Sequence, residues 1–330
     1  MGTQKVALVV GASRGIGRQI AIDLAKNGYA DPKKQNLRRL IPSIWHLSCR
    51  GSKVHNRQKQ HCRLLLPFPP DPNSSESTIT TVAREIREAG GQATAVPVDV
   101  RDFASVEALV ARAAGAYGGR LDALVYNAGA VWWASVEDTP VKRFRLLQQV
   151  NVEGLYGAVQ AALPHLKKTA EGAGGGRIIV GKVGMSVLTK GLAMDFERQE
   201  LKNMSITSFC GRRKSRISAI ESAATQKLQQ TDPATARDLR KPTVFSDAVL
   251  AVLRAPAASV NGLLALDEDF LRSDLGGSVT DFSQYALVPG ASPRRIMPKR
   301  LPDLTVEEQD DEGTRINSAA PVKTKAKAKL

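Results

Sequence analysis

The first residues suited to chemistry form a glycine-rich turn over residues 11–17, with the sequence GASRGIG. An apolar, β-branched run over residues 4–10 precedes the turn, and a helix-like period of apolar residues follows it. Glycines between a strand and a helix let the backbone approach a pyrophosphate, whose charge the helix N-terminus stabilises. We therefore predict a site for dinucleotide phosphates built from Gly11, Ser13, Arg14, Gly15, Ile16 and Gly17.

The elements that must position this turn alternate along most of the chain. Further strands are expected over residues 93–98, 121–126, 177–180, 204–209 and 262–266, and helices over residues 77–89, 104–116, 141–166, 182–200 and 246–253. This alternation predicts an α/β fold with a doubly wound, parallel sheet of Rossmann type and right-handed crossovers. We expect one domain over residues 1–288 and a C-terminal tail over residues 289–330, which is rich in Pro and charged residues and expected to be disordered.

Two segments break the alternation. A second strand is due after Ala30, but residues 31–66 show no period of 2 or 3.6 and are expected to be an atypical insertion that disrupts this strand. The run RLLLPF over residues 63–68 is one candidate for a late replacement strand. The second intrusion, CGRRKSRIS over residues 210–218, follows the strand expected at residues 204–209.

The glycine turn has the spacing GxxxGxG and not GxGxxG, and in this it resembles the short-chain dehydrogenase/reductase family. Three later motifs continue the resemblance in order: PVDV, LVYNAGA and QQVNVEG. The resemblance implies that Asp99 and Val100 contact the adenine, that Asn127, Ala128 and Gly129 let the backbone pass close to the cofactor, and that Asn151 holds a proton-relay water. It also implies that Arg14 favours NADP over NAD by pairing with the 2′-phosphate.

Other segments are similar to the hydroxysteroid-dehydrogenase-like, peroxisomal branch of that family, including GKVGMSVLTKGLAMDFE, GLLALDEDFLR and VTDFSQYALVPG. This resemblance implies an oxidoreductase that uses NADP or NAD on a carbonyl/alcohol pair, with a small-molecule, lipid-like substrate. It also implies a homo-oligomer joined through residues 141–166 and 182–200. The last residues, Ala328, Lys329 and Leu330, resemble a peroxisomal address that an import receptor would read; without it the protein is expected in the cytoplasm.

The expected active site lacks its proton donor. In the family a tyrosine stands four residues before a lysine on one helix, so that both side chains share a helical face. Lys182 matches that lysine, but Ile178 stands four residues before it, and no serine or tyrosine lies between residues 176 and 182. Whether the chain is an active enzyme is therefore left open. The alternative is a catalytically inactive nucleotide-binding protein, or the product of a defective gene model.

Composition argues against several other functions. The net charge of +15 invites a nucleic-acid hypothesis, but it is concentrated in residues 31–63, in residues 210–216 and in the last lysines. Nucleic-acid binding is therefore not expected, and no apolar run is long enough to predict a membrane span. Three cysteines argue against a disulfide framework. The irregular spacing of His46, Cys49, His55, His61 and Cys62 argues against a metal site.

Overall fold

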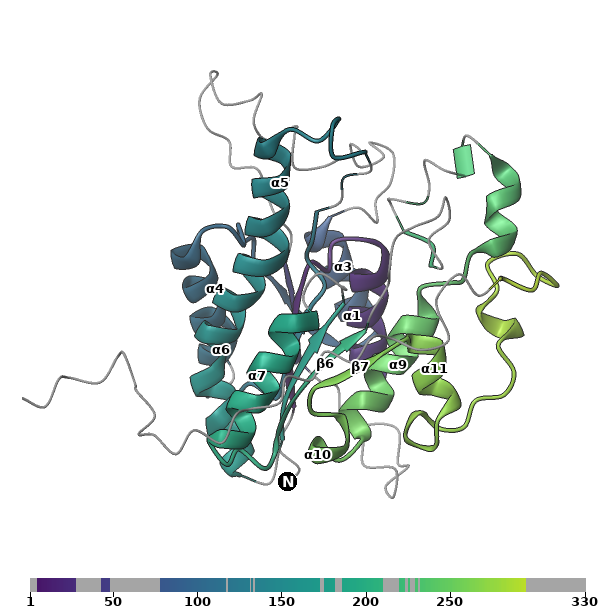
Figure 1. Cartoon of the computed structure of the whole chain (residues 1–330). Helices are drawn as coiled ribbons and strands as arrows, with labels where there is room; N and C mark the ends of the chain where they lie inside the picture. The colour runs from purple at the N-terminus through teal and green to yellow at the C-terminus, as the bar shows by residue number, and fades with distance from the viewer. Residues whose placement is uncertain are drawn as a thin grey trace, which may run out of the picture.

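The computed structural model describes residues 5–27, 43–47, 78–116, 118–130, 134–172, 175–181, 186–209, 220–222, 229–230 and 232–294, together with Trp132 and Thr225. Within them a central sheet is flanked by helices (Figure 1). The strands are β1 (Val6–Val10), β2 (Ser43–Leu47), β3 (Gln92–Ala95), β4 (Ala123–Tyr126), β5 (Gly176–Val180), β6 (Met204–Phe209) and β7 (Leu263–Ala265).

The sheet is parallel throughout and has the strand order β3-β2-β1-β4-β5-β6-β7. The chain first builds outward from β1 to β3 and then returns to the other side of β1, so the strand order reverses between β1 and β4. In doubly wound sheets, ligands bind beyond the carboxyl ends of the strands at this reversal. The predicted fold class is confirmed, and the predicted glycine turn follows β1 at the end of the sheet where such folds bind ligands.

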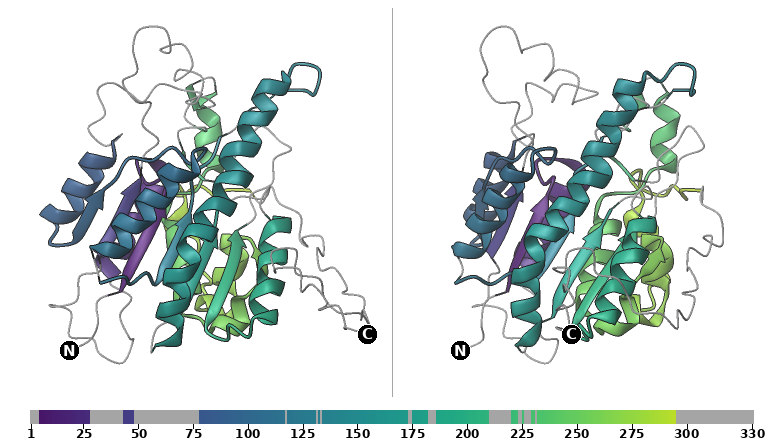
Figure 2. Two further views of the ribbon diagram at one scale, coloured as in Figure 1. Left: turned by 90° about the vertical axis from the view of Figure 1, so that its left-hand side faces the viewer. Right: turned by 60° about the vertical axis from the view of Figure 1, so that its left-hand side comes forward.

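Helices cover both faces of the sheet (Figure 2). One face carries α1 (Gly15–Asn27), α3 (Ile79–Glu88), α9 (Thr243–Arg254) and α11 (Asp267–Arg272), and the other carries α4 (Phe103–Gly115), α6 (Gly154–Glu171) and α7 (Ser186–Arg198). Side chains of β1 alternate between the two cores: Leu8 packs on the α4–α6–α7 side and Val9 on the α1–α9 side. A strand buried on both faces needs a continuous apolar sequence, which VALVV supplies.

The helix predicted over residues 141–166 is interrupted. It consists of α5 (Val141–Gln148), a π-helical turn η1 (Gln149–Glu153) and then α6. No residue of α5 is buried, and the helix rises beyond the ends of the strands (Figure 2). Four short elements complete the described chain: η3 (Pro233–Asp238), α10 (Ala257–Val260), η4 (Asp274–Gly276) and η5 (Ser283–Tyr285).

The second strand lies inside the segment that was expected to be an insertion. Ser43–Leu47 forms β2, which pairs in parallel with β1 on one side and with β3 on the other. Sequence analysis missed this strand because SIWHL is a short apolar run within basic sequence, without the alternation that marks a half-buried strand. The alternative strand at residues 63–68, and most of the expected insertion, lie outside the described residues.

The chain stays packed beyond the predicted domain boundary at residue 288. Ala291 is buried, and Nε of Arg294 donates to Oδ1 of Asp238 at 2.9 Å. Asp238 is the last residue of η3, so the C-terminal segment is fastened to a part of the chain that precedes α9. Residues 295–330, with most of the predicted tail, lie outside the described residues.

Asp267, the first residue of α11, gives a pH-dependent prediction. Burial raises the pKa of this carboxyl to about 6, although the backbone N–H of Glu268 donates to its Oδ1 at 2.8 Å. Because the folded pKa lies above the unfolded one, the carboxyl's stabilising contribution is complete below about pH 4 and is lost as the pH rises through 6.

The variant Asp267→Asn keeps the acceptor for Glu268 and cannot ionise. At pH 7.5 its free energy of unfolding should exceed that of the unchanged chain by about 3 kcal/mol. Denaturant titrations between pH 4 and pH 8 measure this gap. A difference in unfolding free energy that stays constant from pH 4 to pH 8 would contradict a raised pKa of Asp267.

Candidate functional site

The glycine turn that follows β1 is tightly constrained. Gly11 has φ +91° and Gly15 has φ +56°, both in the left-handed region. A Cβ on Gly11 would stand 2.6 Å from the backbone nitrogen of Ala128. A Cβ on Gly17 would overlap the carbonyl oxygen of Gly11 and stand 2.7 Å from Nδ2 of Asn127. At Gly11 and Gly17 the turn can therefore be built only from glycine, because a side chain would collide with neighbouring atoms.

The segment after β4 holds the glycine turn in place. The backbone N–H of Asn127 donates to the carbonyl of Val10 at 2.9 Å, and its Nδ2 donates to the carbonyl of Gly11 at 3.4 Å. Ala128 is buried and Gly129 is exposed. The structure thus joins the glycine turn and the predicted Asn127–Gly129 segment into one surface at the strand-order reversal, with Gly129 open at its edge.

Asn151 lies in the π-helical turn η1 and binds the backbone beyond Gly129. Its Oδ1 accepts from the N–H of Ala130 and its Nδ2 donates to the carbonyl of Ala130, both at 3.1 Å. Two complementary hydrogen bonds fix the orientation of this amide. Asn151 therefore connects the middle of the long helix to the carboxyl end of the central strands, where the glycine turn also lies.

Two residues that sequence analysis missed shape the π-helical turn. The hydroxyl of Tyr126, at the end of β4, donates to the carbonyl of Val150 at 2.6 Å in a fully buried position. Gly154 follows the turn, and a Cβ there would stand 2.5 Å from that hydroxyl oxygen and 2.9 Å from the carbonyl oxygen of Val100. The available signal was a glycine within a helical pattern, which often marks close packing.

Asp99 is already engaged by a neighbour. The guanidinium of Arg101 forms an ion pair with its carboxylate, with Nε donating to Oδ1 at 2.8 Å. This hydrogen bond lowers the pKa of the Asp99 carboxyl. Val100 is buried, and its carbonyl oxygen packs against Gly154 of α6. The carboxylate of Asp99, one of the two predicted adenine contacts, is therefore already paired with Arg101.

Arg14 is a half-buried cation at the glycine turn. Burial lowers the pKa of its guanidinium, and no acidic partner for it is found among the described residues. Ser13 and Ile16 are also half-buried beside it. A partly desolvated guanidinium without a counter-charge favours an anionic ligand, because an anion would repay the cost of its burial.

The residue four positions before Lys182 lies on a strand. Ile178 is buried in β5 and is paired with Leu124 on one side and Ile206 on the other. Lys182 itself lies outside the described residues, and α7 begins at Ser186. Position 178 therefore lies in a strand of the central sheet, whereas the family's tyrosine lies on a helix.

In the described part of the chain, no group of three or more His, Cys, Asp or Glu side chains is placed to hold a metal ion. Of the expected insertion's His and Cys residues, only His46 falls in a described segment. No described helix is long and apolar enough to cross a membrane.

The chain is similar to known dehydrogenases in sequence and in fold. The family model described as short chain dehydrogenase matches residues 73–186. The crystal structure of a short chain dehydrogenase from Mycobacterium thermoresistibile is 30% identical, with a TM-score of 0.66 over 87% of this chain and 92% of that chain. The chain belongs to the short-chain dehydrogenase family. The resemblance inferred from the glycine turn and its companion motifs is thereby confirmed.

Within the short-chain dehydrogenases, the chain is similar to curated proteins of the hydroxysteroid-dehydrogenase-like branch. Hydroxysteroid dehydrogenase-like protein 2 of Mus musculus is 28% identical over 323 residues, or 92% of this chain and 54% of its own length. The protein of the same name from Homo sapiens is 29% identical over 302 residues, or 86% of this chain and 60% of its own length. This short-chain dehydrogenase thus spans little more than half the length of these relatives.

Proposed function

We propose that this chain binds a nicotinamide dinucleotide across the carboxyl ends of β1 and β4, as an oxidoreductase of the short-chain dehydrogenase type acting on a carbonyl/alcohol pair. The observation that supports this most strongly is the cradle of Gly11, Gly17 and Asn127, where no side chain larger than hydrogen fits at either glycine. The backbone there is held by hydrogen bonds from Asn127, so it is preorganised for a pyrophosphate at the N-terminus of α1.

Each member of the site has a proposed part in binding. Gly11, Ser13, Gly15, Ile16 and Gly17 hold the pyrophosphate, and Asp99 and Val100 hold the adenine. Gly129 leaves room for the cofactor beyond the carboxyl end of β4, while Asn151 fixes the backbone at Ala130. The nicotinamide, when bound, supplies or accepts the hydride; Lys182 is proposed to hold its ribose.

We propose that the preferred cofactor is NADP, because Arg14 at the turn is a half-buried cation with no acidic partner among the described residues. Replacing Arg14 by Gln should weaken NADPH binding by roughly 10-fold to 100-fold, since a hydrogen bond to a charged phosphate is worth about 1.5–3 kcal/mol. NADH, which lacks the 2′-phosphate, should bind almost unchanged. Fluorescence titrations with both nucleotides measure the two affinities.

The matched control for Arg14 is Arg84→Gln on α3. Arg84 is exposed and forms only an i, i+4 pair with Glu88, so its loss should leave both affinities unchanged. Equal losses for NADPH and NADH in the Arg14 variant would show that Arg14 supports the turn and does not read the phosphate.

A second candidate function is dinucleotide binding without turnover. It is favoured by the position of Ile178 within β5, because the tyrosine of the family would have to share a helix with Lys182. General acid catalysis by a positioned side chain contributes about 10²-fold to 10⁴-fold in rate. We expect hydride exchange to be slower than in an intact relative by about that factor.

One experiment separates the two candidates. The purified chain is first titrated with NADPH and NADH, and the absorbance of the reduced nicotinamide is then followed with a panel of aldehydes, ketones and alcohols. Binding without turnover supports the second candidate. Turnover at the rate of an intact relative supports the first and requires another proton donor. Failure to bind either nucleotide would overturn both and leave the product of a defective gene model.

We also propose a homo-oligomer, a lipid-like substrate and a peroxisomal location. Exposed apolar side chains along the long helix, Val141, Phe144 and Tyr156, support an oligomer contact on that helix. The substrate class comes from the similarity to hydroxysteroid dehydrogenase-like proteins. The location depends on Ala328, Lys329 and Leu330, which lie outside the described residues.

A further inference from the structure

A short segment after β6, residues 220–222, returns to the glycine turn. The Cα atom of Ser222 lies 3.8 Å from the position that a Cβ on Gly15 would take. Residues 220–222, which we call the strap, therefore lie against the glycine turn at Gly15.

The strap is held by backbone contacts to Arg240. Ile220 and Arg240 form a parallel β-bridge, and the N–H of Glu221 donates to the carbonyl of Arg240 at 2.8 Å. Arg240 is also bridged in antiparallel fashion to Ala286. Three segments far apart in sequence thus lie side by side, with the one containing Arg240 in the middle.

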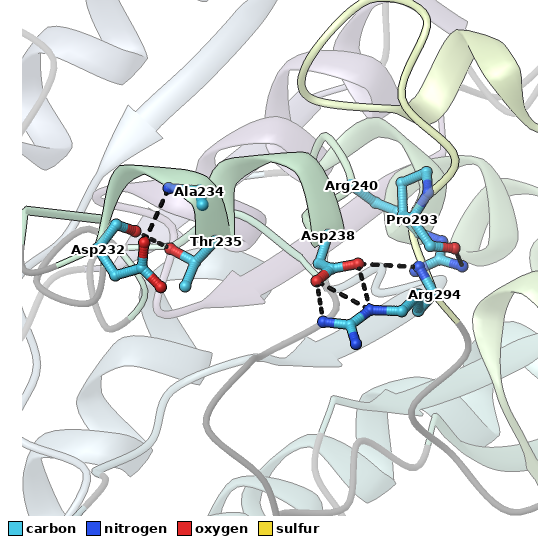
Figure 3. Close-up of polar contacts among 7 residues, drawn as sticks. All are labelled: Asp232, Ala234, Thr235, Asp238, Arg240, Pro293 and Arg294. Atoms are coloured by element: carbon cyan, nitrogen blue, oxygen red, sulfur yellow. Dashed lines mark hydrogen bonds and ion pairs between the residues drawn. The ribbon is translucent and has the colours of Figure 1, made fainter.

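The side chain of Arg240 fastens this middle segment to the body of the protein. It is only 6% exposed, and its Nη2 forms an ion pair with Oε2 of Glu268 on α11 at 2.6 Å. Nη2 also donates to the carbonyl of Pro293 at 3.3 Å, a contact seen in Figure 3. A buried guanidinium is costly unless it is paired, so the segment cannot move away from Glu268 without stranding a charge.

A second ion pair fastens the same segment from its other side. Arg294 pairs with Asp238, two residues before Arg240, next to the contact between Arg240 and Pro293 (Figure 3). The C-terminal segment over residues 285–294 therefore touches the Arg240 segment through Ala286, Pro293 and Arg294. The segment that holds the strap is therefore itself held by residues 285–294.

We propose that Arg240 is a positioning residue for cofactor binding: it holds the strap against the glycine turn, and the C-terminal segment acts on the crevice through it. The cofactor part of this inference rests on the proposed nicotinamide-dinucleotide function, whereas the strap part does not. Arg240 acts entirely through the backbone of residues 220–222 and needs no contact with the nucleotide.

The test compares Arg240→Gln with Arg272→Gln. Arg272 pairs with the same carboxylate, Nη2 to Oε1 of Glu268 at 2.8 Å, and is exposed, and no contact of it with the strap is seen in the described residues. Amide hydrogen exchange read by mass spectrometry reports on the strap without any ligand. We expect Arg240→Gln to speed exchange at Glu221 by about 10-fold or more, while Arg272→Gln leaves it unchanged.

The second readout is NADPH affinity by fluorescence titration. Arg240→Gln should weaken binding about 10-fold, which corresponds to about 1.4 kcal/mol, and Arg272→Gln less than about 2-fold. Arg240→Lys keeps the charge and one contact to Glu268 and should recover part of the loss. If Arg240→Gln does not fold, Glu268→Gln serves in its place, because it removes the charge partner and leaves the backbone bridges in position.

The outcomes distinguish a failure of the inference about Arg240 and the strap from a failure of the proposed cofactor binding. Unchanged exchange at Glu221 in Arg240→Gln overturns the inference. Faster exchange with unchanged NADPH affinity overturns the link to the cofactor. Faster exchange in a protein whose unchanged form binds no nicotinamide nucleotide supports the strap and overturns the proposed function instead.

Discussion

Replacing Gly17 by Ala should abolish measurable dinucleotide binding. The added methyl would overlap the carbonyl oxygen of Gly11 and stand 2.7 Å from Nδ2 of Asn127. Both neighbours are fixed, since Asn127 also donates through its backbone to Val10. We expect affinity for NADPH to fall at least about 100-fold, or about 2.7 kcal/mol. The free energy of unfolding should fall by about 1–3 kcal/mol, as is usual for overpacking.

Gly191→Ala is the matched control for this experiment. Gly191 lies within α7, and no atom stands within 4 Å of a Cβ built there. The same glycine-to-alanine change should therefore leave NADPH binding intact and stabilise the helix by about 0.5–1 kcal/mol. Fluorescence titration and thermal unfolding of both variants give the comparison. NADPH binding by Gly17→Ala at the affinity of the unchanged chain would place the phosphate site elsewhere.

Gly154→Ala should destabilise the protein although alanine favours helices. Its methyl would stand 2.5 Å from the hydroxyl oxygen of Tyr126 and 2.9 Å from the carbonyl oxygen of Val100. We expect the free energy of unfolding to fall by about 2–3 kcal/mol. Tyr126→Phe alone should cost about 1 kcal/mol, because it removes the hydrogen bond to Val150 and leaves the ring in place.

The double variant tests whether the two residues act together. Tyr126→Phe removes the oxygen that the new methyl would meet. The loss of unfolding free energy in the double variant should therefore be smaller than the sum of the two single losses, by about 1 kcal/mol or more. Denaturant titration of the four proteins gives this coupling. Strict additivity would mean that the carbonyl of Val100, and not the hydroxyl, excludes a side chain at Gly154.

The parts of the site that could be predicted from sequence are local ones. The glycine turn is fixed by the strand before it and the helix after it, so GASRGIG and its flanks were sufficient. Asn127 and Asn151 were identified through motifs in the same order as in the family. These features depend on residue type at short spacing, which a sequence displays directly.

The parts that could not be predicted depend on contacts between distant segments. Ser43–Leu47 becomes a strand because β1 and β3 offer hydrogen-bonding edges on both sides, not because its own sequence alternates. Tyr126 and Gly154 matter because β4 and α6 meet at the π-helical turn. In the sequence Arg240 is one of many basic residues, and only its contacts with Glu268 and Pro293 in the fold show that it is buried and paired.

Strand β2 lies between β1 and β3, so the sheet cannot keep β3 in this place without Ser43–Leu47. A chain from which residues 31–66 are removed would lose the hydrogen bonds of β2 to β1 and to β3. The facing edges of β1 and β3 would then be unpaired, and α3 would lose its link to the sheet through β3. Bare parallel edges recruit other chains, so such a shortened product should be found in aggregates. Within the expected insertion, Ser43–Leu47 is therefore the strand that connects β3 to the rest of the sheet.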